Sequence, residues 1–93
     1  MRALKTMGQR LHWAREAAGV SARELDRLAG KTPGHVGLIE ARDSDATGKT
    51  LAAYAAVLGL SLDWLIVGDK DRAPRVEDMT VAVARARERA AAA

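Results

Sequence analysis

Apolar residues recur at three- and four-residue intervals in short segments along residues 7–69, and a glycine or small polar residue separates each segment from the next. This spacing is typical of amphipathic helices that bury one face. The Gly, Ser and Thr residues at the breaks are the types that end and begin helices. We therefore expect an all-α domain over residues 1–69, built from five short helices around one core.

The first two helices have clear boundaries in the sequence. The first is expected over about residues 4–18, with Gly19 ending it in the left-handed conformation. Ser21, followed three residues later by Glu24, predicts a capping box at the start of the second helix. Gly30 is expected to end that helix.

The third helix is expected over residues 33–41. Thr32 is predicted to cap it, and Pro33 suits its first turn because the amide hydrogen that proline lacks would be unpaired there anyway. Val36 and Ile39 are expected to face the core. Two glycines within this segment make it a weak helix, since each costs about 1 kcal/mol relative to Ala.

The fourth and fifth helices follow the same scheme. Thr47 and Ser61 are the predicted caps, and Gly59 and Gly68 the predicted ends. The residues expected to face the core are Leu51, Ala55 and Leu58 in the fourth helix and Leu62, Leu65 and Ile66 in the fifth.

Residues 70–75 contain charged residues and a proline and are predicted to be a linker, and residues 76–93 a C-terminal helix. That helix could frame a dimer, pack on the domain or fray. We favour a dimerisation role, because its sparse apolar stripe has no evident place in the domain core. The candidate dimer surfaces are the stripe of Val76, Met79 and Val83 and the region of Leu60, Trp64 and Val67.

Four strings resemble the lambda-repressor/Cro-type helix-turn-helix domain, the XRE family of bacterial and phage regulators. They are GQRLHWAR at 8–15, GVSAREL at 19–25, VGLIE at 36–40 and LGLSLDWL at 58–65. The resemblance implies a five-helix fold whose third helix enters the DNA major groove. It also implies a transcriptional regulator, a repressor, that binds double-stranded DNA sequence-specifically as a homodimer.

The same resemblance assigns roles to individual residues. It implies a structural pair between Arg10 on the first helix and Glu40 on the third. It places Thr32, Pro33, Gly34, Gly37 and Leu38 at the base-facing positions. The remaining candidate DNA contacts, from the flanks and to phosphates, are Arg15, Arg23, Lys31, His35, Arg42 and Lys49.

The base-facing positions depart from the family where DNA would be read. Direct readout relies mostly on Arg, Lys, Asn and Gln, and none of these occupies those positions. The loop that follows carries Asp43 and Asp45, which repel phosphate. Residues 31–69 hold three basic and five acidic residues, although the whole chain is net +3. An alternative is therefore a protein-binding member of the fold, such as an antirepressor or an adaptor.

Other functional classes find little support in the sequence. No nucleophile–base pair, glycine-rich phosphate loop or carboxylate dyad stands out, so we expect no enzyme activity and no cofactor. Two histidines and no cysteine do not make a metal site. The absence of a signal peptide or a long apolar run predicts a cytoplasmic protein.

Overall fold

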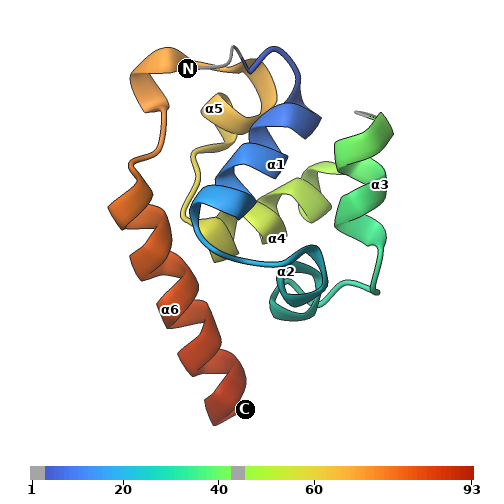
Figure 1. The fold of residues 1–93 in the computed structure, drawn as a ribbon, viewed down its shortest axis with the longest axis vertical. Coiled ribbons are helices and arrows are strands. Elements are labelled where there is room, and N and C mark those ends of the chain that lie inside the picture. The colour runs from blue at the N-terminus through green and yellow to red at the C-terminus, as the bar shows by residue number, and fades with distance from the viewer. Residues whose placement is uncertain (1–3, 43–45) are drawn as a thin grey trace.

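The computed structural model describes residues 4–42 and 46–93, and these ranges are helical apart from short connections (Figure 1). The all-α fold and its C-terminal helix are confirmed. The elements are α1 (Met7–Ala17), α2 (Ala22–Leu28), α3 (His35–Arg42), α4 (Gly48–Leu58), α5 (Leu62–Val67), the 3-10 turn η1 (Lys70–Arg72) and α6 (Val76–Ala92).

Local capping signals begin most of these helices. The hydroxyls of Ser21, Thr47 and Ser61 each accept a hydrogen bond from a backbone amide in the first turn of the helix that follows, as predicted. A full capping box does occur, but between Thr6 and Gln9 at the start of α1. The box predicted at Ser21 is only half formed, because the side chain of Glu24 turns to α6.

The start of α3 differs from the prediction. The helix begins at His35, and Gly34 precedes it with a φ of 91°, a left-handed conformation that favours glycine. The Thr32 side chain is not the cap. Instead, the buried carboxylate of Asp26 on α2 accepts a hydrogen bond from the amide of Val36 at 3.1 Å. A side chain ten residues upstream thus takes the role expected of an adjacent threonine.

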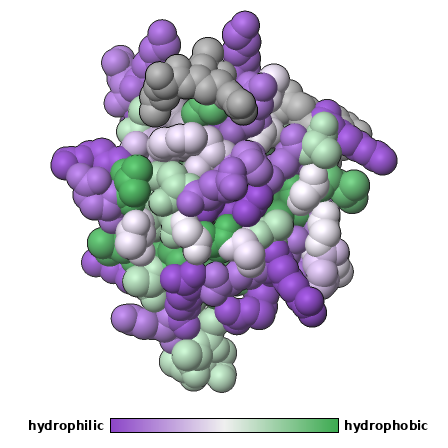
Figure 2. All heavy atoms as spheres, in the orientation of Figure 1, coloured by the Kyte–Doolittle hydropathy of each residue, from purple (hydrophilic) through white to green (hydrophobic). Residues whose placement is uncertain are grey.

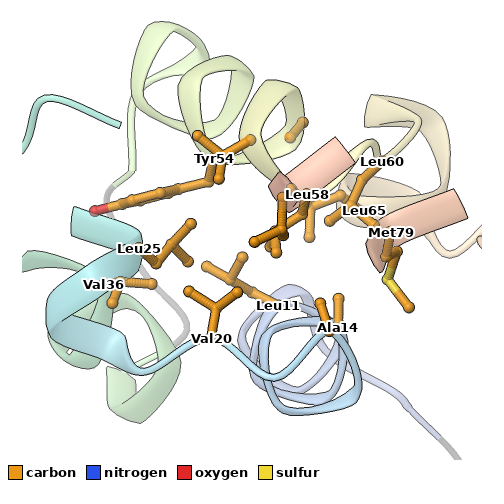
Figure 3. Close-up of a cluster of buried hydrophobic side chains, with 14 of the residues drawn as sticks. Leu11, Ala14, Val20, Leu25, Val36, Tyr54, Leu58, Leu60, Leu65 and Met79 are labelled. Carbon is orange, nitrogen blue, oxygen red and sulfur yellow. The ribbon is translucent and has the colours of Figure 1, made fainter. Parts of the chain in front are cut away.

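The core lies where α1, α2, α4 and α6 meet, with α3 and α5 closing its sides (Figure 3). Met79 and Val83 of α6 are fully buried in it, against α4. The prediction that these two residues form an exposed dimer surface is therefore wrong. Met79 and Val83 pack against apolar side chains of their own chain, so they need no dimer partner to be buried.

Helix α5 is buried on one side only. Trp64 and Leu65 lie in the core, and Trp64 meets the partly exposed Trp13 edge to face at 5.9 Å between ring centres. Leu62 and Ile66, which were expected to face inward, remain 39% and 45% exposed. Only a narrow stripe of this six-residue helix faces the core, and Leu62 and Ile66 lie outside that stripe.

Apolar side chains appear on the face shown in Figure 2 as separate patches among polar ones. Helices that could span a membrane are absent from the described residues.

Candidate nucleic-acid interface

Helices α2 and α3 form the helix-turn-helix. The amide of Lys31 donates to the carbonyl of Asp26 at 2.7 Å, and Gly30 has a φ of 73°, so the chain leaves α2 in a tight turn. Val36 and Ile39 are the buried residues of α3, as predicted. Leu38 points outward and is 56% exposed. The helix is therefore held by one face and presents the other.

A buried polar network fixes the start of α3. The hydroxyl of Tyr54 on α4 donates to Asp26 at 2.6 Å, and the same carboxylate accepts from the Val36 amide (Figure 3 shows the Tyr54 ring reaching toward α2). Burial, together with the hydrogen bond and the charge of Asp26, raises the pKa of Tyr54. The role of Asp26 could not be predicted from local patterns, because its two hydrogen-bond partners lie 10 and 28 residues further along the chain.

The end of α3 is held by an ion pair. Arg15 on α1 contacts Glu40 through two hydrogen bonds, of 2.9 Å and 3.1 Å, and also donates to the carbonyl of Val20. This contact raises the pKa of Arg15, mainly through the hydrogen bond to Glu40. His12 lies beside the pair, with Nδ1 2.7 Å from a Glu40 oxygen. Arg15 is therefore occupied within the fold, which removes it from the candidate phosphate contacts.

The predicted pair between Arg10 and Glu40 is wrong. Arg10 is buried and donates to three backbone carbonyls, those of Leu4, Leu65 and Ile66. The last two belong to the final turn of α5, where carbonyls have no partner within the helix. Arg10 thus caps α5, and the arginine five positions later takes Glu40.

The remaining flanking cations are accessible. Arg23, Arg42 and Lys49 are exposed, and Lys31 is partly exposed. Arg23 and Lys31 line an open groove that no pattern in the sequence indicates. Its lining consists of Ser21, Arg23, Glu24, Arg27, Lys31 and Pro33. Arg27 is a further candidate, and its spacing of four residues from Arg23 could have identified it.

The predicted base-facing residues lie on and beside α3. Thr32, Pro33, Gly34 and Leu38 are exposed, and Gly37 is partly so. His35 is half-buried, with its ring 6.4 Å from that of Tyr54. Asp43 and Asp45 lie outside the described residues. Across residues 4–42 and 46–93, acidic and histidine side chains nowhere gather in a group of three that could hold a metal ion.

The comparisons with known proteins agree with this geometry. A family model described as helix-turn-helix matches residues 11–65, and the chain belongs to that family, of the lambda-repressor/Cro type. The chain is also similar to the HTH-type transcriptional regulator DicA of Escherichia coli (strain K12), with 33% identity over 69 residues. That match covers 74% of this chain and 51% of the relative, so the chain spans about half the relative's length. No solved structure matches significantly.

Proposed function

We propose that the protein binds double-stranded DNA as a transcriptional regulator, with α3 facing the major groove. The observation that carries this proposal is the helix-turn-helix pair, in which α3 is anchored at both ends and leaves one face free. The match to the helix-turn-helix family and the similarity to the transcriptional regulator DicA support the proposal. A repressor is the form we favour.

Phosphate contacts dominate the proposed complex. Gly34, which precedes α3, and Gly37 and Leu38 on α3 offer no bidentate hydrogen bonds to bases. Leu38 can meet a thymine methyl group. The charged contacts come from the flanks, through Arg23, Arg27, Lys31, Arg42 and Lys49. Such an interface discriminates between sequences through DNA shape more than through base edges.

A gel shift on the DNA upstream of the protein's own gene, at two salt concentrations, tests the proposal. We expect binding that weakens steeply with salt, and an Arg42→Ala or Lys31→Ala variant with a salt slope lower by about 0.9. Lys70→Ala removes the same charge from the exposed η1 turn and is the control. Tight binding that barely responds to salt would contradict phosphate-dominated contact.

We further propose that the regulator acts as a homodimer through α5. Of the surfaces considered, Leu60 and Trp64 are buried, whereas Val67 is 74% exposed next to the exposed Leu62 and Ile66. A symmetric pair would cover these side chains and set two α3 helices about one turn of DNA apart. Ile66→Ser should then shift sedimentation toward the monomer, and an unchanged dimer would place the interface elsewhere.

The alternative is a protein-binding member of the family. The exposed Leu38 and the absence of base-reading side chains beside it favour this second candidate. The two are separated by one comparison. Failure to bind any DNA at low salt, together with loss of a protein partner on Leu38→Ser, would select the alternative.

A further inference from the structure

One contact joins the C-terminal helix directly to the helix-turn-helix. Arg87 on α6 donates two hydrogen bonds to Glu24 on α2, from Nε to Oε2 at 3.0 Å and from Nη2 to Oε1 at 2.7 Å. The same guanidinium lies 3.5 Å from the carbonyl of Gly19. Both carboxylate oxygens are therefore taken by one arginine, a two-point geometry that fixes orientation as well as charge.

Glu24 is the acidic residue in the lining of the groove described above. Arg23, Arg27 and Lys31 line the same groove. Arg27 lies 3.6 Å from Oε2 of Glu24, one helical turn away on α2. This contact is a long ion pair, and it coexists with the two shorter hydrogen bonds from Arg87. Without Arg87, Glu24 would repel a phosphate and would have Arg27 as its remaining cationic partner. Arg87 offsets the negative charge of Glu24 from the other side, which leaves more of the Arg27 charge for a phosphate.

We propose that Arg87 is a positioning residue for DNA binding: it neutralises Glu24 and so leaves the α2 groove free to take a DNA phosphate. The inference rests on the proposed function. It gives α6 a role in DNA affinity that requires no contact between α6 and DNA. The phosphate contacts themselves belong to Arg23, Arg27 and Lys31.

The electrostatics of the pair agree with this role. The hydrogen bond to Arg87 lowers the pKa of Glu24, and the pKa of Arg87 is raised in return. Both groups are charged at neutral pH, so the pair presents no net charge to the groove. Arg85 and Arg89 are exposed on another side of α6, since helical residues two apart do not share a face.

The test is a double-mutant cycle on the full chain, with Arg87→Ala, Glu24→Gln and the double variant. Affinity for a labelled random-sequence duplex is measured by fluorescence anisotropy at low salt. In Arg87→Ala, the Glu24 carboxylate lacks this partner and repels a phosphate in the groove. This Coulomb repulsion predicts about three- to ten-fold weaker binding. Glu24→Gln should bind as well as wild type or better, and the double variant should match Glu24→Gln. Arg89→Ala, which removes the same charge from α6, should change affinity less than Arg87→Ala.

Each other outcome is decisive. Weakening by Arg87→Ala that persists with Glu24→Gln would mean that Arg87 touches DNA itself, and overturns the inference. No weakening in Arg87→Ala also overturns it. If wild type binds no DNA at low salt, the proposed function fails first and this inference with it. Circular dichroism melts check the fold of each variant, and Arg87→Met, which keeps the alkyl stem, replaces an unfolded Arg87→Ala.

Discussion

Helices α3 and α6 are held against the rest of the domain by different kinds of interaction. Helix α3 has eight residues, and polar groups hold its two ends, Asp26 at the start and Arg15 at the end. Helix α6 has seventeen residues and is attached by an apolar stripe that includes Met79 and Val83. A short helix that must leave one face free has little apolar surface to bury. Directional polar contacts therefore fix both its ends, whereas buried apolar area supplies most of the attachment of α6, with the Arg87–Glu24 contact in addition.

The largest effect should come from removing α6. Deleting residues 74–93 strips three buried side chains from the core, among them Met79 and Val83. We expect a loss of more than about 5 kcal/mol, which is comparable to the whole stability of a small domain. The thermal melt followed by circular dichroism should lose its cooperative transition. A truncated protein that stays folded would show that the domain does not need α6. It would support the prediction of a C-terminal helix joined to the domain by a linker.

Breaking the anchor at the start of α3 should come next. Asp26→Ala leaves the Tyr54 hydroxyl and the Val36 amide buried without an acceptor, which costs about 4 kcal/mol. Urea denaturation measures the loss, and hydrogen exchange at the Val36 amide reports on α3. Asp26→Asn keeps one acceptor oxygen and should lose less. Equal stability of wild type and Asp26→Ala would show that this network does not hold α3 in place.

The anchor at the end of α3 is less buried. Glu40→Ala strands the Arg15 guanidinium, and we expect a loss of about 3 kcal/mol in chemical denaturation. The distinctive result is a double-mutant cycle with Arg15→Ala, which should show strong coupling. The same cycle with Arg10→Ala should show little, because Arg10 binds the end of α5. Coupling of Glu40 to Arg10 instead would overturn the pairing seen in the structure.

The close approach of α4 to α6 is a finer test of apolar attachment. Gly59 has a φ of 68°, and a Cβ placed there would lie 2.8 Å from the Cβ of Ala82. Gly59→Ala should therefore lose about 2 kcal/mol, from backbone strain plus crowding. Gly30→Ala has a similar φ with open space around it and should lose about 1 kcal/mol. If the two variants have the same melting temperature, crowding against α6 contributes nothing to the cost of Gly59→Ala.

The smallest effect concerns Tyr54 and pH. Its raised pKa means that the folded state holds the phenol proton more tightly than the unfolded state, whose pKa is about 10. This contribution is complete below pH 10 and declines as pH rises above it. The chain has one tyrosine, so tyrosinate absorbance should appear only on unfolding. Tyr54→Phe should lose about 1 kcal/mol at neutral pH and depend less on alkaline pH. Early tyrosinate absorbance from folded protein would contradict this.

Much of the scaffold could be predicted because its signals are local. Ser21, Thr47 and Ser61 cap the helices that the sequence indicated, and the period of apolar residues located the core face of α4. The start of α3 could not be predicted in the same way. Thr32 and Pro33 form a sound local cap pattern, but Gly34 allows a left-handed turn and a distant carboxylate takes over.

The sequence by itself determined the helices, their order and the helix-turn-helix, because periodicity and capping act over about four residues. Only the tertiary structure decided the polar partners. Glu40 joins an arginine 25 residues away, Asp26 a tyrosine 28 away and Glu24 an arginine 63 away. Two arginines on α1 compete for such partners, and the packing of the helices chooses between them. The same packing placed Met79 and Val83 of the candidate dimer surface in the core, while Val76 stays 44% exposed, since burial depends on what lies opposite a face.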